Sequence, residues 1–241
     1  MGVVSAAGQI PPQRGSELAL ETLQLGAGET REVGDAGHDV LLFAHAGGGE
    51  LGGRALGSGS AALLLEGEPA DLVAGAEGIS LVRITLGGDT DLHAPMGARD
   101  HVVAIDAVEP GKATGSRSFQ ILFGPHNGSR RATMFVGYVP PGKAPWHYHL
   151  YDEIVWIWRG PGRYYLDDEG EPLEDGSAFR ITPREVHIVE NTHPERELAV
   201  LGIFTPAGSP SAACLTSDIA ATYGFGSACR STRTSCPNAP T

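Results

Sequence analysis

Four side chains in the C-terminal half of the chain have the residue types and the spacing of a metal site. His147 and His149 are two residues apart, and residues i and i+2 of a β-strand face the same side. Glu153 follows a short turn, and His187 follows a proline turn at Pro183. Glu153 and His187 each open another strand-like run, so we expect all four side chains to point into one space.

Three imidazoles and one carboxylate form a donor set of intermediate softness, which suits Mn, Fe, Co, Ni, Cu or Zn better than Ca or Mg. One or two coordination positions would remain for water or substrate. In the alternative interpretation, the histidines are only hydrogen-bonded inside a barrel. Because converging ionisable side chains are costly to bury without a cation, we expect one divalent transition metal (Mn, Fe, Ni, Cu or Zn) on His147, His149, Glu153 and His187.

Short β-strands must position these side chains. The chain has 34 glycines and 17 prolines, which suit many turns and few long helices. The predicted strands are rich in β-branched and aromatic residues, and they cover 40–45, 61–65, 79–86, 102–108, 119–123, 132–139, 153–158, 163–166, 178–181, 186–190 and 198–204. The pattern favours an all-β sandwich or barrel. Residues 47–49, all glycine, are predicted to form a hairpin turn, and residues 217–223 a short helix.

The strand pattern repeats along the chain. Residues 39–43 with Gly47 align with residues 152–156 with Gly160, and residues 59–61 align with residues 176–178. Two copies of one β-unit would give this order of matching features. We therefore predict two related β-barrels.

The metal-site segment resembles the motifs of the cupin superfamily. The stretch from Gly142 through His-x-His and Glu to Gly160 is similar to the first cupin motif, and the stretch from Gly176 to Asn191 is similar to the second. The resemblance covers about residues 140–205. It implies a double-stranded β-helix (jelly-roll) barrel of the cupin 2 type, with His147, His149, Glu153 and His187 as metal ligands. Arg184 departs from the family, which usually has a glycine in that turn.

Together, the repeat and the resemblance imply a bicupin. We predict a degenerate N-terminal barrel over residues 1–110, a metal-binding barrel over 111–210, and a short helix with a disordered tail over 211–241. In the repeat, the four ligand positions align with Gly34, Ala36, Val40 and Ala70. None of these side chains binds a metal, so we expect the first barrel to be structural.

Strand alternation indicates which residues line the site. Counting from Glu153, Val155 should face the metal, and Trp156 should face away as a core or interface residue. Arg163 and Arg180 lie on strands that should run past the cavity, where an inward Arg could hold a substrate carboxylate through two hydrogen bonds. The residues alone leave that role open.

The composition argues against several function classes. The formal net charge of −12 argues against a nucleic-acid partner, because phosphate binding depends on Lys and Arg. No apolar run approaches the roughly 20 residues that span a bilayer. Cys214, Cys229 and Cys236 provide no disulfide framework for the preceding residues, and the N-terminus does not read as a secretory signal. We therefore expect a cytoplasmic protein without a membrane partner.

The resemblance implies a metal-dependent enzyme with a small-molecule substrate. Cupin dioxygenases use Fe, Ni or Cu, and cupin isomerases and lyases use Mn or Zn. The metal would act as a Lewis acid, and Glu153, with its spare carboxylate oxygen, would double as a base. The alternative is a non-catalytic small-molecule or metal-binding cupin. A storage role, similar to that of seed-storage bicupins, has no need of the four ligands. Homodimerisation is a further implication of the resemblance.

Overall fold

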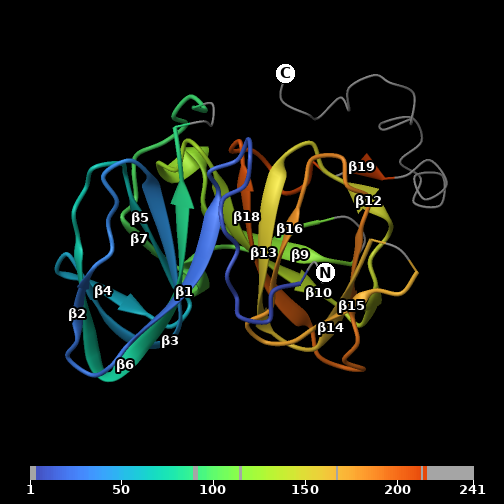
Figure 1. The fold of residues 1–241 in the computed structure, drawn as a ribbon, viewed down its shortest axis with the longest axis horizontal. Helices are drawn as coiled ribbons and strands as arrows, with labels where there is room; N and C mark the ends of the chain where they lie inside the picture. Colours follow the sequence, from blue (N-terminus) through green and yellow to red (C-terminus); the bar gives the residue numbers. More distant parts are fainter. Residues whose placement is uncertain (1–3, 89–91, 114–115, 167, 213, 216–241) are drawn as a thin grey trace.

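The structure, a computed structural model, describes residues 4–88, 92–113, 116–166, 168–212 and 214–215. The regular secondary structure of these residues is β-strand, apart from two short 3₁₀ segments, η1 (Ile105–Ala107) and η2 (Pro125–Asn127). Two sheet assemblies lie side by side (Figure 1). The predicted all-β jelly-roll fold is confirmed. The predicted helix at 217–223 lies outside the described residues.

The N-terminal assembly is one antiparallel sheet with the strand order β1-β6-β3-β5-β7, in which β2 pairs with β6 and β4 pairs with β3. Its strands are β1 (Ala19–Leu25), β2 (Thr30–Glu32), β3 (Asp39–Leu51), β4 (Arg54–Gly57), β5 (Ser60–Leu64), β6 (Asp71–Leu86) and β7 (Val102–Ala104). The two longest strands, β3 and β6, pair along most of their length through two register shifts in β3. Such bulges bend a strand, and the sheet thereby curves into a barrel.

The three consecutive glycines lie within β3, so the predicted hairpin turn there is wrong. Gly47 and Gly49 sit at the register shifts of β3 against β6. A Cβ atom on Gly47 would lie 2.2 Å from the carbonyl oxygen of Gly78, and one on Gly49 would lie 2.2 Å from that of Val73. The glycines are therefore needed for close approach of two backbones, which a single sequence does not distinguish from a turn.

Aliphatic side chains fill the interior of the N-terminal barrel. One buried cluster joins Leu23, Val40, Leu42, Leu56 and Leu72 with further Leu, Val, Ile and Ala side chains. Val40, which the repeat aligns with Glu153, has no exposed surface. An apolar interior of this kind offers no donor atoms to a metal.

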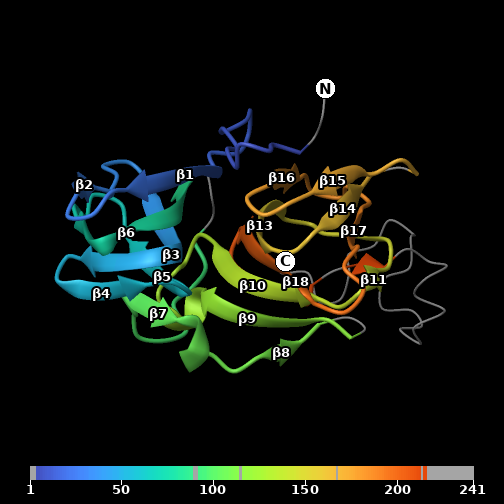
Figure 2. The ribbon, with the colours of Figure 1, turned by 90° about the horizontal axis from the view of Figure 1, so that it is seen from below.

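The C-terminal assembly has a six-stranded sheet (β16-β13-β18-β10-β9-β8), a four-stranded sheet (β11-β17-β14-β15) and the pair β12-β19. Its strands are β8 (Gly111–Lys112), β9 (Ser118–Phe123), β10 (Thr133–Val139), β11 (Gly142–Lys143), β12 (His147–Tyr148), β13 (Asp152–Arg159), β14 (Gly162–Tyr165), β15 (Glu171–Leu173), β16 (Ala178–Ile181), β17 (Ile188–Asn191), β18 (Leu198–Thr205) and β19 (Cys214–Leu215). Figure 2 shows β9 and β10 on the opposite side of the barrel from β14 and β15.

Strand pairing agrees with the alignment of the internal repeat. In the N-terminal sheet, Phe43 pairs with Ala61 on β5. In the C-terminal sheet, Trp156 pairs with Ala178 on β16. The repeat aligns Phe43 with Trp156 and Ala61 with Ala178. The pair Phe43–Ala61 therefore occupies the same position in the N-terminal sheet as the pair Trp156–Ala178 does in the C-terminal sheet.

A shared core joins the two barrels. One buried cluster contains Leu41 and Phe43 from β3 together with Met134 from β10 and Trp156 from β13. Phe43 also meets Trp158 edge to face, with ring centroids 5.0 Å apart. Strand alternation predicted that Trp156 faces away from the metal side, and its place in this shared core confirms that prediction.

The N-terminal segment lies against the C-terminal barrel before it enters the other barrel. Ser5 forms an antiparallel bridge with Ala178 on β16, and the Ser16 hydroxyl donates a hydrogen bond to Asp152 over 2.5 Å. Arg180 also pairs with Asp152 and donates to the carbonyl of Leu18. Local sequence patterns carry no signal for such long-range contacts.

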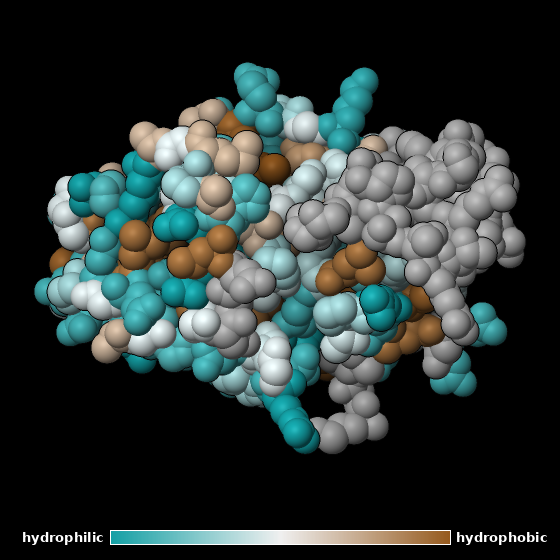
Figure 3. All heavy atoms as spheres, turned by 90° about the horizontal axis from the view of Figure 1, so that it is seen from above, coloured by the Kyte–Doolittle hydropathy of each residue, from teal (hydrophilic) through white to brown (hydrophobic). Residues whose placement is uncertain are grey.

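Hydrophobic residues are scattered on the visible surface. In Figure 3 they appear as small groups separated by hydrophilic residues. Within the described part of the chain, no helix is both long enough and apolar enough to cross a bilayer.

Candidate metal centre

Three of the four predicted ligands meet inside the C-terminal barrel. His147, His149 and His187 each offer one ring nitrogen, and these atoms lie within 4.8 Å of one another. The three side chains are buried, with exposed fractions of 5%, 6% and 1%. Spacing in the sequence therefore identified residues that the fold brings to one point.

Backbone pairing holds the two ligand-bearing segments together. The His187 N–H donates to the His147 carbonyl over 2.9 Å, and the His147 N–H donates to the His187 carbonyl over 3.2 Å. The N–H of Arg184 also donates to the carbonyl of His149, over 2.6 Å. Arg184 has a φ of 71°, so this turn needs the left-handed conformation that glycine adopts without strain.

Hydrogen bonds fix the rings of His147 and His187. The Nδ1 atom of His147 lies 2.8 Å from the Pro145 carbonyl, and that of His187 lies 2.9 Å from the Glu185 carbonyl. A carbonyl only accepts, so each Nδ1 carries the hydrogen and each Nε2 has the lone pair. Bonds of this kind orient histidine ligands of metals.

Burial keeps these imidazoles neutral. Burial lowers the pKa of His187 to about 3, with a further contribution from His149. Burial also lowers the pKa of His147 well below its usual value, with further contributions from His187 and His149. Metal ligation requires neutral imidazole, so both rings have the protonation state that a metal needs.

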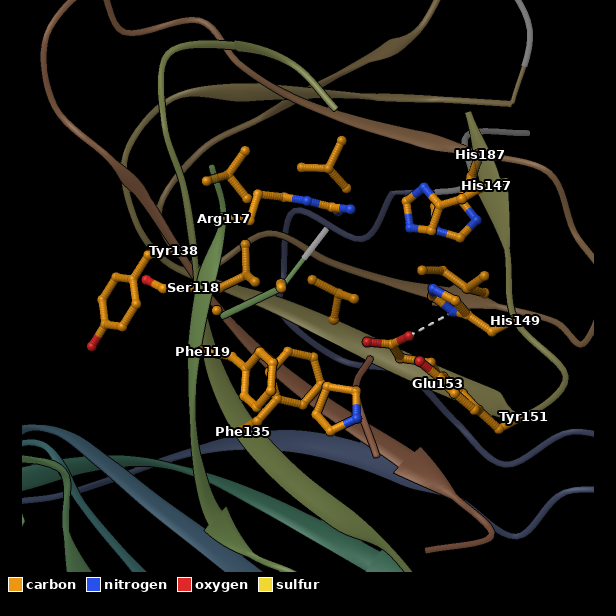
Figure 4. Close-up of a pocket in the computed structure, with 18 residues that line it drawn as sticks. Arg117, Ser118, Phe119, Phe135, Tyr138, His147, His149, Tyr151, Glu153 and His187 are labelled. Atoms are coloured by element: carbon orange, nitrogen blue, oxygen red, sulfur yellow. Dashed lines mark ion pairs between the residues drawn. The ribbon is translucent and has the colours of Figure 1, made fainter. Parts of the chain in front are cut away.

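Glu153 lies beside the histidines at the start of β13. Its Oε2 atom is 2.9 Å from the Nδ1 atom of His149, as the dashed line in Figure 4 indicates. Neither atom has a hydrogen-bond partner, although both are buried. A short contact without a hydrogen bond leaves two buried polar atoms unsatisfied, which is costly. A cation at this position would satisfy them, so the residues fit a metal.

A second layer of side chains supports the His187 segment. The Tyr164 hydroxyl donates to Glu185 over 2.9 Å, and the Thr182 hydroxyl donates to the other oxygen of that carboxylate over 2.8 Å. Burial, followed by the charge of Glu185, raises the pKa of Tyr164, which therefore remains protonated as the donor. On the other side, the Tyr151 ring stacks on His149 with centroids 4.6 Å apart.

A cavity of about 100 Å³ opens beside this cluster. Figure 4 shows that the Arg117 side chain crosses it toward His147 and His187. Val155 lines the cavity, as strand alternation from Glu153 predicted. The other lining residues are largely apolar, and they include Phe119, Phe135, Val139, Ile181, Val189, Val200 and Pro210.

Arg163 and Arg180, on strands expected to run past the cavity, do not line it. Arg180 pairs with Asp152 at the N-terminal segment, and Arg163 donates to the carbonyls of Glu169 and Gly170 in an exposed position. Neither lines the cavity, whereas Arg117 does. Arg117 precedes β9, and the local sequence pattern gave no signal for its place at the cavity.

Comparison with known proteins gives one family match. Residues 134–204 match the family model described as the cupin domain (Cupin_2). These residues contain all four predicted ligands. No curated protein sequence matched the chain.

Several solved structures share the fold. Oxalate decarboxylase from Bacillus subtilis at pH 4.6 is 17% identical, with a TM-score of 0.63 over 80% of this chain and 69% of that chain. The structure used to assign the Mn(II) centres of the same enzyme is 16% identical, with a TM-score of 0.65 over 88% of this chain and 77% of that chain. At this identity the likeness concerns the fold alone. The family match and the shared fold support placing residues 134–204, and with them the candidate metal centre, in the cupin superfamily.

Proposed function

We propose that the C-terminal barrel holds one divalent transition metal and acts as an enzyme on a small organic substrate, as a dioxygenase or as an isomerase or lyase. The ligands would be His147, His149, Glu153 and His187. The observation that carries the proposal is the convergence of three buried imidazole nitrogens within 4.8 Å, beside a carboxylate that lacks a hydrogen-bond partner on Oε2.

Each residue has a distinct role in this proposal. When bound, a divalent metal supplies Lewis acidity toward a substrate oxygen. His147 and His187 present fixed lone pairs, because their Nδ1 hydrogens are bound to carbonyl oxygens. Glu153 offers a carboxylate oxygen that can accept a proton from the substrate. The apolar cavity walls exclude water from the reacting groups, which strengthens electrostatic interactions.

The fold comparisons support including lyase chemistry. The two similar structures described above are of oxalate decarboxylase, and one of them comes from a study of its Mn(II) centres. Decarboxylation belongs to the lyase class, so Mn(II) and small carboxylic acids are the first metal and the first substrates to test.

The metal assignment is tested by elemental analysis of purified variants. Wild-type protein should hold about one transition-metal ion per chain. The variants His147→Ala and His187→Ala should lose it, since each removes one ligand, while circular dichroism remains that of a folded β-protein. His126→Ala is the matched control because His126 is exposed in η2. Metal content equal to wild type in both ligand variants would refute the site.

A non-catalytic binding protein is the second candidate. One observation favours it: among the described residues that line the cavity, Glu153 is the only carboxylate, so a separate acid or base is not present there. Turnover separates the two functions. Incubation of the metal-loaded protein with a panel of small carboxylic acids, followed by mass spectrometry of the products, should detect conversion if the first proposal holds.

We further propose that residues 1–110 form a degenerate cupin barrel related to residues 111–210. Equivalent strand pairing at Phe43–Ala61 and Trp156–Ala178 supports this relation. The aliphatic interior supports the loss of a metal site. Metal analysis that finds about one ion per chain, and none after His187→Ala, would agree with a single site.

A further inference from the structure

Phe135 forms part of the wall of the cavity beside the candidate metal centre, together with Phe119. The two rings meet edge to face with centroids 6.4 Å apart, and the Phe135 ring also lies 6.0 Å from the Phe204 ring. In Figure 4 the Phe119 and Phe135 rings lie together, apart from the three histidines. Aromatic pairs at these distances attract each other, so two neighbouring rings hold Phe135 in place.

Glycines on two neighbouring strands leave the space that the Phe135 ring occupies. Phe135 on β10 pairs directly with Gly202 on β18. A Cβ atom at Gly202 would overlap Cζ and Cε1 of Phe135, and a Cβ atom at Gly137 would lie 3.3 Å from Cε2. The far end of the ring therefore lies over Gly202, across the sheet, as an aromatic side chain does when its cross-strand partner is glycine.

The same glycine brings the Phe135 ring close to the carboxylate of Glu153. A Cβ atom at Gly202 would also lie 3.0 Å from Oε1 of Glu153, and Gly202 pairs with Val155 on its other side. Phe135, Glu153 and Val155 all line the cavity. A substrate that reaches the Glu153 carboxylate therefore meets the Phe135 ring.

The cavity is small for an organic substrate. Its volume is about 100 Å³, whereas an apolar protein cavity that takes up benzene measures about 150 Å³. Val189 on β17 and Val200 on β18 close it from both sheets. Packed side chains of this kind yield only at a cost. The space suits a short chain, but not a ring together with the polar group that would meet the metal.

We propose that Phe135 is a specificity-determining residue, which limits the substrate to short acyclic molecules with one polar, metal-binding end and an apolar body of a few carbon atoms. The inference rests on the proposed function, because it names the substrate class of the same site. A larger body would have to displace the ring, which its aromatic neighbours hold against the sheet. Phe135→Ala should therefore open the cavity to cyclic bodies.

The test uses two metal-binding probes that differ in the size of their bodies. Acetohydroxamate and benzohydroxamate share one chelating head group, and they carry a methyl group and a phenyl ring. Each is titrated by isothermal titration calorimetry into metal-loaded wild type, Phe135→Ala and Phe135→Leu. The control is Trp158→Leu, because Trp158 packs against Phe43 and is not among the described residues that line this cavity. The readout is the ratio of the two dissociation constants, in which changes in head-group binding cancel.

Wild-type protein should bind acetohydroxamate about tenfold or more tightly than benzohydroxamate, as a misfit in an apolar pocket implies. Phe135→Ala should remove this preference, and Phe135→Leu should reduce it, since Leu fills only part of the space of the ring. Trp158→Leu should keep the wild-type ratio although it loses packing. A wild-type ratio in Phe135→Ala would overturn the inference. If that variant does not fold, a wild-type ratio in Phe135→Leu would do so.

Protein treated with EDTA separates this inference from the proposed function. Xenon and benzene are added, and binding is followed by NMR through the methyl resonances of Val155, Val189 and Val200. Xenon should shift these resonances in wild type, and benzene should shift them only in Phe135→Ala, because apolar cavities bind such probes when the size allows. This pattern in a protein that holds no metal as purified would overturn the proposed function and still support the size limit. Equal shifts with benzene in both proteins would overturn the size limit, even where metal is present.

Discussion

The contact between His149 and Glu153 determines how the site behaves with and without a metal. The two atoms are 2.9 Å apart, are buried, and form no hydrogen bond. Glu153→Gln should therefore have opposite effects in two conditions. In EDTA, the Gln amide can donate to the Nδ1 atom of His149, and the thermal midpoint should rise, because an unsatisfied buried group costs about 1–3 kcal/mol. With excess metal, the midpoint should fall below that of wild type.

Thermal unfolding in both conditions, with a competition titration of metal affinity, measures this reversal. The affinity should fall by more than the roughly 10- to 100-fold that loss of an outer hydrogen-bond partner costs, because Glu153 is itself proposed as a ligand. Glu195→Gln, at an exposed position, is the control. A midpoint that falls equally in both conditions would mean that Glu153 has only a structural role.

Arg184 stores backbone strain next to His187. A non-glycine residue in the left-handed region costs about 1–2 kcal/mol, and Arg184 has a φ of 71°. Its side chain is exposed, so Arg184→Gly removes little packing. Because glycine also makes the unfolded chain more flexible, we expect a net gain of up to about 1 kcal/mol in the free energy of unfolding.

Urea denaturation measures this change, and metal content should remain that of wild type. Arg184→Val is the opposing variant, since a β-branched residue tolerates positive φ poorly, and it should be less stable than wild type. Equal stability of the Gly and Val variants would contradict the strain.

At the scale of the elements, β18 makes room for the site by means of Gly202. A Cβ atom there would lie 2.3 Å from the Phe135 ring and 3.0 Å from Oε1 of Glu153. Gly202→Ala must therefore displace a cavity wall or the carboxylate. We expect a loss of about 1–3 kcal/mol in the free energy of unfolding, together with weaker metal binding.

The control for this substitution is Gly57→Ala in β4, where an added Cβ has no atom within 4 Å and φ is not positive. Stability is measured in urea and metal affinity by competition. If both variants matched wild type in metal affinity and stability, Gly202 would have no part in shaping the site.

Strand periodicity explains why the sequence predicted most of these elements. Alternation from Glu153 correctly sent Val155 to the cavity and Trp156 to the core shared by the barrels. The spacing of the histidines was informative because two strands and two turns determine where those side chains point. Strand alternation and turns depend on residues close together in the chain, so they can be predicted from a single sequence.

Features that depend on contacts between distant segments were not predictable. The glycines at 47–49 read as a turn because the backbone of β6, which they allow to approach, is remote in sequence. Arg117 was missed because its neighbours at the cavity come from other strands. The role of Arg180 was left open because its partners, Ser16 and Leu18, are remote from it in sequence.

At the scale of the whole molecule, the shared core should make the two barrels unfold together. Phe43 is fully buried and meets Trp158 across the interface. Phe43→Ala should cost about 3–5 kcal/mol, although Phe43 belongs to the barrel without the site. We expect one transition in differential scanning calorimetry at a lower temperature, with metal release in the same transition.

The control is Val73→Ala, because Val73 is 41% exposed, and its effect should stay within about 0.5 kcal/mol. Two separate transitions in the Phe43→Ala protein, with metal retained until the second, would show that the barrels unfold independently.

The contact of Ser5 with Ala178 has a consequence for how the protein is made. Ser5 is translated before Ala178, so the segment around Ser5 has no partner strand until the residues between them have been translated. The N-terminal barrel can close first, as domains usually do during synthesis. The segment around Ser5 can dock only after β16, which carries Ala178, has emerged from the exit tunnel.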